Sequence, residues 1–260
     1  MQERVLYKNC PLCESAAIAE HRIGNCSQHP SYRPQLSNKI RWMQCAGCGH
    51  VFTEGYYTDE ALNLIFEKTQ SNQNVGDDLE QNRLLSARMI DKITPFKDRG
   101  IWLDVGFGNG SLLFTAKEYG FKPIGLDLRE QTVAQMKTLG IEAHRKDVCD
   151  FTSAEKVAVI SMADVLEHTH YPKLVLAAAR GLLEDDGVLF VSMPNTDTIL
   201  WDVTTKQNVN PFWGEMEHYH NFSRGRLYAL LRETGFTPLR YGISERYRMC
   251  MEVIARPKAA

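Results

Sequence analysis

Residues 101–112 read IWLDVGFGNGSL, an apolar run followed by a glycine-rich turn, and the next residues, LFTAKEYG, continue as a helix. This order predicts a buried strand, a tight turn and a helix. Glycines at 106, 108 and 110 let the backbone bend sharply and approach a ligand, and the helix start offers free N–H groups. The turn alone is weak evidence, because dinucleotide-binding proteins share similar turns. Those proteins carry GxGxxG, however, whereas the spacing here is GxGxG.

Three acidic residues follow successive predicted strands. Asp104 comes directly before the glycine turn, where its carboxylate can meet a cationic ligand group. The next strand, KPIGLDL, ends with Asp127, and an acid at that tip suits a bidentate hydrogen bond to ribose hydroxyls. Asp147, in HRKDVCDF, follows a third short strand, near the expected place of an adenine amino group. The pattern predicts a nucleoside-containing cofactor.

The segment MADVLEH, residues 162–168, places Asp164, Glu167 and His168 at the end of a fourth strand, where ligands bind in open α/β sheets. Two carboxylates and an imidazole are most of a divalent metal site, and His218 in GEMEHYHNFS could supply a further ligand. Three interpretations stay open: a metal site, acid/base or substrate work without metal, and structural support. In the first two, His168 or His218 is the best general base, since imidazole titrates near neutrality.

Taken in order, the LDVGFGNG loop, the LDL tip, the KDV turn and the DVLEH segment resemble the class I S-adenosylmethionine-dependent methyltransferases over residues 100–255. The resemblance implies a Rossmann-like seven-stranded α/β sheet with its last strand antiparallel. It also implies a cofactor-binding set that runs from the methionyl end to the adenine end: Asp104, Gly106, Gly108, Gly110, Asp127, Asp147 and Val148. The DVLEH segment with His218 resembles metal-dependent members, among them small-RNA 2′-O-methyltransferases, although Asp164 stands where those usually have Glu.

Two cysteine pairs near the start, Cys10-Pro-Leu-Cys13 and Cys45-Ala-Gly-Cys48, predict a separate small module. Two CxxC turns supply the four thiolates of a tetrahedral zinc site, and four protein ligands leave no open position for chemistry. We therefore expect structural zinc rather than a redox dithiol, which would occur once and within a βαβ unit. Cys26 and His29 lie between the pairs and are either replacement ligands or ordinary loop residues.

The expected organisation is a zinc-binding, ribbon-like module at 1–55, a helical linker or lid at 56–98 and a methyltransferase domain at 99–260. Polar residues 69–78 should form a mobile loop between two amphipathic helices. Residues 194–221 show little periodicity and should cover the substrate with Trp201, Phe212 and Trp213. Two strands near the end should close the sheet as a hairpin.

The expected function is methyl transfer from S-adenosylmethionine to a small molecule or carbohydrate, such as a sugar, a surface polysaccharide or a secondary metabolite, with O-methylation favoured. A ribosomal- or transfer-RNA methyltransferase that reads RNA with its zinc module is the alternative enzyme. A net charge of −2 and the lack of a basic stripe in residues 1–52 disfavour it. A non-catalytic binding subunit is the alternative of another class. No signal core or membrane-length apolar run is present, so we expect a cytoplasmic protein without a membrane partner.

Overall fold

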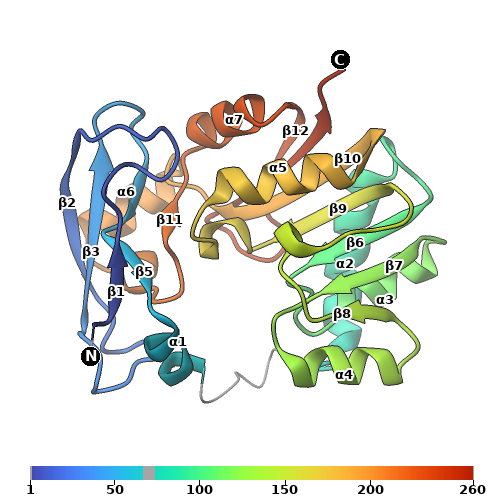
Figure 1. The fold of residues 1–260 in the computed structure, drawn as a ribbon, viewed down its shortest axis with the longest axis horizontal. Coiled ribbons are helices and arrows are strands. Elements are labelled where there is room, and N and C mark those ends of the chain that lie inside the picture. Colours follow the sequence, from blue (N-terminus) through green and yellow to red (C-terminus); the bar gives the residue numbers. More distant parts are fainter. Residues whose placement is uncertain (1, 67–73, 260) are drawn as a thin grey trace. The chain divides into compact units, whose positions relative to one another are not determined.

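The computed structural model describes residues 2–66 and 74–259. The chain divides into two compact units, and each is described here by itself. The cysteine unit comprises Met1–Thr69, Leu166–Pro172 and Pro194–Leu230. The Rossmann unit comprises Gln70–Val165, Lys173–Met193 and Leu231–Ala260. Each unit is therefore built from segments that are far apart in the sequence (Figure 1).

The Rossmann unit contains a seven-stranded sheet in the order β12-β13-β10-β9-β6-β7-β8. The neighbours among β6 to β10 run parallel, whereas β12 and β13 form an antiparallel hairpin. The strands are β6 (Ile101–Val105), β7 (Lys122–Leu126), β8 (Glu142–His144), β9 (Val157–Ala163), β10 (Leu183–Pro194), β12 (Phe236–Ile243) and β13 (Cys250–Pro257). The predicted α/β sheet with an antiparallel last strand is confirmed.

The central strands of this sheet are continuously apolar, so both faces of the sheet must be shielded from water. Helices provide this cover. The helices are α2 (Leu79–Ile93), α3 (Ser111–Glu118), α4 (Glu130–Thr138) and α5 (Pro172–Leu182), and α7 (Arg224–Glu233) ends in this unit. Side chains of α2 and α3 share one core cluster with β6, β9 and β10, and this cluster includes Trp102 and Phe190. The close packing fixes the ends of the strands, where the candidate cofactor residues lie.

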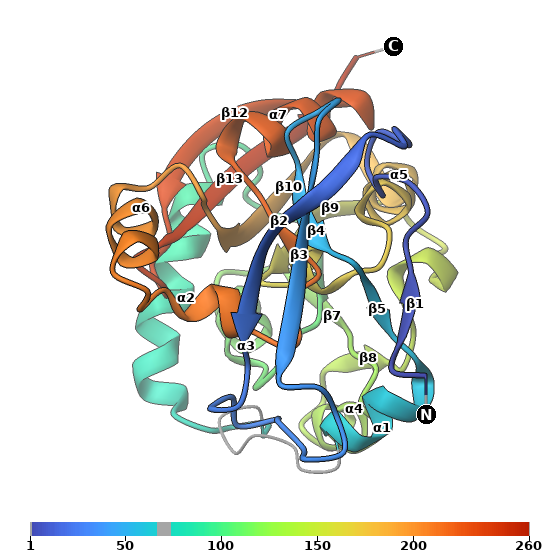
Figure 2. The ribbon, with the colours of Figure 1, turned by 90° about the vertical axis from the view of Figure 1, so that its left-hand side faces the viewer.

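The cysteine unit contains a four-stranded sheet, β11-β4-β3-β2, and a two-stranded sheet, β1-β5. Figure 2 labels β1 to β5, and Figure 1 labels β11. Its elements are β1 (Arg4–Leu6), β2 (Ile18–Asn25), β3 (Lys39–Cys45), β4 (Val51–Thr53), β5 (Gly55–Tyr57), α1 (Asp59–Phe66), α6 (Ile199–Lys206) and β11 (His220–Asn221). The edge strand β11 comes from late in the chain and pairs antiparallel with β4, His220 opposite Phe52. The unit's core joins Trp42 to Trp201 and Trp213. The N-terminal strands thus share one core with residues 194–230.

Most of the local predictions match these elements. The helix Leu79–Ile93 ends before Pro95, and the terminal strands form the expected hairpin. Residues 194–221 contain a helix that the sequence pattern missed, α6, which Thr198 caps by accepting from the Trp201 N–H at 3.0 Å. The expected mobile loop at 69–78 lies partly outside the described residues. No helix within the described ranges combines the length and apolar character of a membrane span.

Candidate active site

The glycine turn between β6 and α3 has the backbone form that its sequence predicts. Gly106, Gly108 and Gly110 all have positive φ, at 67°, 57° and 80°. A Cβ at position 106 would lie 2.9 Å from the Val165 side chain, whereas a Cβ at position 108 would meet only the Gly106 carbonyl oxygen, at 4.0 Å. The turn is therefore tight at Gly106, and at Gly108 its backbone can be approached closely, as a bound cofactor requires.

Asp104 lies at the end of β6 and is 3% exposed. Its Oδ1 accepts a hydrogen bond of 2.6 Å from the Ser161 hydroxyl on β9, which itself accepts from Trp102 Nε1 at 2.8 Å. Burial raises the pKa of Asp104 to about 7, against the opposing effects of Ser161 and of the Arg246 charge. A cationic group placed beside this carboxylate would restore its charge, so Asp104 suits the ammonium end of a ligand.

Asp127 and Asp147 lie beyond the next two strands. Asp127 is 7% exposed, and Arg129 occupies both of its oxygens, with guanidinium distances of 2.9 and 2.8 Å. A ribose bound to Asp127 must therefore compete with Arg129. The Asp147 side chain accepts from the Cys149 N–H at 2.8 Å and caps a single 3₁₀ turn that begins at Val148, which is buried. The strand-end positions match those expected from the sequence, but the Arg129 contact was not foreseen.

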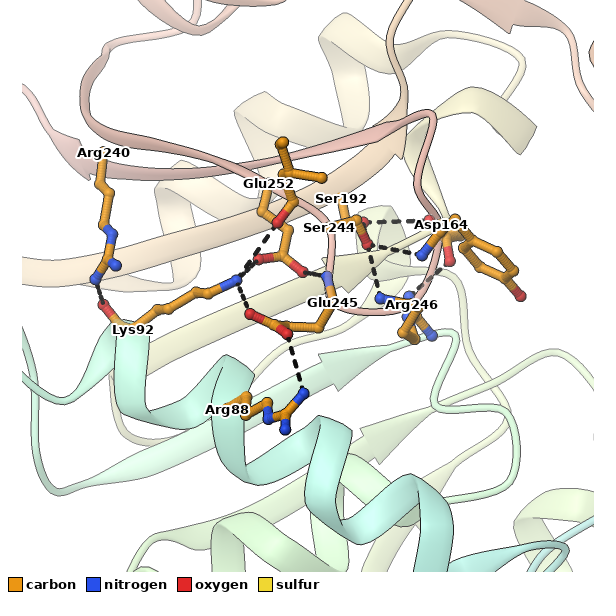
Figure 3. Close-up of polar contacts among 11 residues, drawn as sticks. Arg88, Lys92, Asp164, Ser192, Arg240, Ser244, Glu245, Arg246 and Glu252 are labelled. Carbon is orange, nitrogen blue, oxygen red and sulfur yellow. Dashed lines mark hydrogen bonds and ion pairs between the residues drawn. The ribbon is translucent and has the colours of Figure 1, made fainter. Parts of the chain in front are cut away.

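Asp164 also belongs to the Rossmann unit, and its φ of 58° is unusual for a residue with a Cβ. Its carboxylate accepts from Arg246 at 2.7 Å and from the Ser192 hydroxyl at 3.3 Å (Figure 3). Arg246 lies in the loop between β12 and β13. Asp164 is thus engaged by a cation, and the groups of described residues that could hold a metal ion do not include it.

The β12–β13 loop that carries Arg246 is tied to helix α2 by a charged network (Figure 3). Lys92 of α2 contacts Glu245 at 2.5 Å and Glu252 at 2.6 Å, and Arg88 contacts Glu245 at 3.8 Å. Glu252 is only 3% exposed, and Lys92 supplies a cationic partner for this buried side chain. No sequence motif predicted this network, because its members are spread over three elements.

The four paired cysteines converge in the cysteine unit. Their Sγ atoms lie 3.7 Å apart in Cys10 and Cys48, and 3.5 Å apart in Cys13 and Cys45. Thiolates about 2.3 Å from a tetrahedral zinc would be about 3.8 Å apart, so the residues fit that ion. Burial raises the pKa of Cys45, but N–H groups of the turn and the neighbouring thiols outweigh it and lower the pKa to about 7. The lowered pKa favours the thiolate form of Cys45, and the thiolate is the form of cysteine that binds metal.

The two intervening candidates, Cys26 and His29, do not join these four ligands. The Cys26 thiol donates to the Ser37 carbonyl oxygen at 3.5 Å, and His29 Nε2 lies 2.5 Å from a Glu215 carboxylate oxygen. Among the described residues, the cysteine group that could hold an ion consists of the two CxxC pairs alone.

Glu167, His168 and His218 form a second group whose candidate ligand atoms all lie within 4.8 Å of one another. The rings of His168 and His218 are 4.6 Å apart between centroids and nearly perpendicular. Glu167 is 1% exposed and His218 is 7% exposed. Leu166–Pro172 and Pro194–Leu230 both belong to the cysteine unit, so all three side chains lie in that unit.

The hydrogen bonds around His168 and His218 leave ring nitrogens that can bind a metal ion or a proton. His168 Nδ1 must donate to the Glu217 carbonyl oxygen at 2.8 Å, because a carbonyl only accepts, and this leaves the Nε2 lone pair available. His218 Nδ1 is buried without a hydrogen-bond partner among the described residues. Burial, followed by the neighbouring His168, lowers the pKa of His218 to about 3, so this ring is neutral near pH 7. The neutral His218 ring, the His168 ring and a buried carboxylate fit a divalent cation such as zinc or manganese.

The sheet order and the acids at the strand ends define the class I S-adenosylmethionine-dependent methyltransferase fold. A family model described as "Methyltransferase domain" matches residues 79–241, more than half of the chain. The chain belongs to this methyltransferase family.

Curated relatives and solved structures agree with this assignment. The chain is 31% identical to the ubiquinone biosynthesis O-methyltransferase of Actinobacillus pleuropneumoniae serotype 5b, over 36% of this chain and 45% of that protein, less than half of its length. It is 31% identical to the protein of that name from Nitrosococcus oceani, over 58% of this chain and 72% of the relative. The 1,6-didemethyltoxoflavin-N1-methyltransferase of Burkholderia thailandensis, crystallised with S-adenosylhomocysteine, shares the fold, with a TM-score of 0.55 at 19% identity over 71% of this chain and 83% of that one.

Proposed function

We propose that this protein transfers a methyl group from S-adenosylmethionine to a hydroxyl of a small-molecule or carbohydrate acceptor. The observation that carries the proposal is the buried Asp104 beside the positive-φ glycine turn, within a chain of the methyltransferase family. A hydroxyl acceptor is favoured because the curated relatives are named O-methyltransferases. When bound, the cofactor would supply an electrophilic methyl group on a sulfonium; the aligned hydroxyl oxygen takes this methyl group, the neutral thioether leaves, and a base accepts the hydroxyl proton.

The residues of the Rossmann unit would hold the cofactor. Asp104 would pair with its ammonium group and Asp127 would exchange Arg129 for the ribose hydroxyls. Gly106, Gly108 and Gly110 let the backbone approach the ligand, and Asp147 with Val148 would border the adenine. Asp104, whose pKa is raised in the free protein, would become a stable carboxylate when the cationic group binds.

The residues of the cysteine unit would serve the acceptor. Glu167, His168 and His218 would either accept the hydroxyl proton directly, with His168 Nε2 as the base, or hold a divalent cation that lowers the pKa of the hydroxyl. The orphaned His218 Nδ1 and the oriented His168 support the second version. Asp164 would hold Arg246 in the β12–β13 loop rather than bind the cation. The four cysteines would hold a structural zinc ion.

Calorimetry of S-adenosylmethionine binding, with an Asp127→Ala variant, tests the proposal. Loss of a charged hydrogen-bond pair should weaken binding by about 1.5–3 kcal/mol. Glu142→Gln removes an exposed carboxylate of the same unit and should leave the affinity unchanged. An unchanged affinity in Asp127→Ala would contradict the cofactor site.

The acceptor class needs a separate assay. Incubation with methyl-labelled S-adenosylmethionine and pooled sugars, phenols and catechols should label one class, and magnesium, manganese or zinc should restore activity after EDTA if the divalent version holds. Labelling of total RNA alone would point to the RNA enzyme instead, and tight cofactor binding with no labelled acceptor in any pool would favour a non-catalytic subunit.

A further inference from the structure

Two side chains of the loop between β2 and β3 hold the segment that precedes His218. His29 Nε2 donates to the Glu215 carboxylate at 2.5 Å, and the Ser31 hydroxyl donates to the Glu217 carboxylate at 2.9 Å. Ser31 is 4% exposed. Both pairs are formed within the cysteine unit, across more than 180 residues of sequence. Ser31 is buried and the other three residues are partly buried, so water shields these contacts less than it shields those between fully exposed side chains.

The orientation of His29 is itself fixed. The Ser31 N–H donates to His29 Nδ1 at 3.1 Å, so Nδ1 is the acceptor nitrogen and Nε2 carries the proton that faces Glu215. Burial raises the pKa of Glu215, but the hydrogen bond from His29 is the largest of the effects that outweigh it and lower the pKa to about 2. Glu215 is therefore a permanent anion close to the two candidate catalytic histidines.

The backbone of the segment that Glu215 and Glu217 anchor orients the candidate catalytic group. The Glu217 carbonyl oxygen accepts from His168 Nδ1 at 2.8 Å, and the Tyr219 N–H donates to the Glu167 carbonyl oxygen at 2.8 Å. His218 lies between these two contacts. A shift of the segment would therefore change the His168 tautomer and the place of His218 together.

The other end of the segment is fixed independently. His220 Nε2 donates to the Thr169 carbonyl oxygen at 2.9 Å, so its Nδ1 accepts from His50 Nε2 at 3.0 Å. His50 follows the second cysteine pair directly after Gly49. This buried chain secures the residues after His218, which leaves the His29 and Ser31 pairs to secure the residues before it.

From these contacts we propose that His29 and Ser31 are positioning residues for His168 and His218, so that the N-terminal loop completes the acceptor site instead of serving a separate partner. The proposal rests on the methyltransferase function proposed above. His29 acts through Glu215, and Ser31 acts through the Glu217 side chain and hence its carbonyl. Neither is required to touch the acceptor.

The test uses the full-length, zinc-loaded protein labelled with ¹⁵N-histidine, together with Mn²⁺ and S-adenosylmethionine as separate probes. In the wild type, His168 should show the Nδ1–H tautomer, with its signal assigned by a His168→Gln variant. His29→Leu and Ser31→Ala should lose the uniform tautomer and weaken Mn²⁺ binding about 10–100-fold, as changes to groups behind metal ligands do. Affinity for S-adenosylmethionine should stay within about twofold, because the cofactor residues lie in the Rossmann unit.

Conservative variants separate positioning from folding. His29→Gln keeps a donor for Glu215 and Ser31→Thr keeps a hydroxyl, so both should retain the tautomer and most of the Mn²⁺ affinity. Gln28→Ala changes an exposed residue of the same loop and should have no effect. A wild-type tautomer in both His29→Leu and Ser31→Ala, or a loss equally large in the conservative variants, would overturn the proposal. Failure of the wild type to bind S-adenosylmethionine would instead refute the proposed function, and the tautomer measurement would still decide the role of His29 and Ser31.

Discussion

Single buried residues set the chemistry of this protein, and Asp104 is the clearest case. A carboxyl group at the end of a parallel strand loses its water, and one hydroxyl, that of Ser161, only partly replaces that solvation. The group is consequently held partly protonated in the free protein until a cation arrives. The glycines around it contribute conformation, and Asp104 contributes the charge.

The raised pKa of Asp104 predicts a specific pH dependence of stability. Its pKa rises from 3.8 to about 7 on folding, so between about pH 4 and pH 7 the folded protein binds a proton that the unfolded chain has released. The free energy of unfolding should therefore fall as pH rises through this window. Urea unfolding at pH 5 and pH 8 measures the change, and Asp104→Asn, which cannot ionise, should show a smaller decrease. Equal decreases in both proteins would contradict the assigned cause.

At the scale of elements, helix α2 is joined to the sheet by two kinds of contact. Its apolar face, with Met89, Ile90 and Ile93, packs into the core, and Lys92 reaches the β12–β13 loop. That loop also carries Arg246, which engages Asp164 at the end of β9. The position of α2 therefore bears on the end of the sheet where the cofactor residues lie.

Removing the Lys92 charge should destabilise the protein. Lys92→Met leaves the buried Glu252 without its cation, which typically costs about 3–5 kcal/mol. The double variant Lys92→Met with Glu252→Gln should recover part of the loss, because the buried charge is then absent. Chemical denaturation measures both, and Lys117→Met, at an exposed site of α3, should change stability by less than about 0.5 kcal/mol. No recovery in the double variant would show that lost packing, rather than charge, explains the loss.

At the scale of the whole molecule, the two units should respond differently to metal removal. Three of the four tryptophans, Trp42, Trp201 and Trp213, share the core of the cysteine unit, whereas Trp102 lies in the Rossmann unit. If four thiolates hold a structural zinc, chelation should loosen the first core only.

We expect about one zinc per chain, a loss of near-ultraviolet tryptophan dichroism after chelation, and retained S-adenosylmethionine binding. Cys45→Ser should reproduce these changes, and Cys149→Ser, at an exposed cysteine away from the pairs, should not. Less than half a zinc per chain would refute the zinc site, and loss of cofactor binding together with the dichroism would show that the units do not fold separately.

The sequence by itself determined the features that depend on neighbouring residues. The glycine turn, the acids at the strand tips and the CxxC turns are local patterns, because a turn needs residues that tolerate positive φ and a strand ends where its apolar run ends. The seven-stranded sheet was expected because these patterns, in their order, resemble those of the class I methyltransferases. The pairing of Glu167 and His168 with His218 was also foreseen, although only as one arrangement among several.

Tertiary structure alone decided how polar side chains distant in sequence were paired. Arg129 could have faced solvent, Asp164 could have joined Glu167, and His29 could have been a loop residue or a zinc ligand. Instead Asp164 engages Arg246, and His29 engages Glu215. Residues 194–230 join the N-terminal strands because Trp201 and Trp213 share a buried apolar core with Trp42. A single polar contact adds little net stability, so apolar packing decides which polar side chains come together. A local sequence pattern cannot show which distant residues that packing will bring into contact.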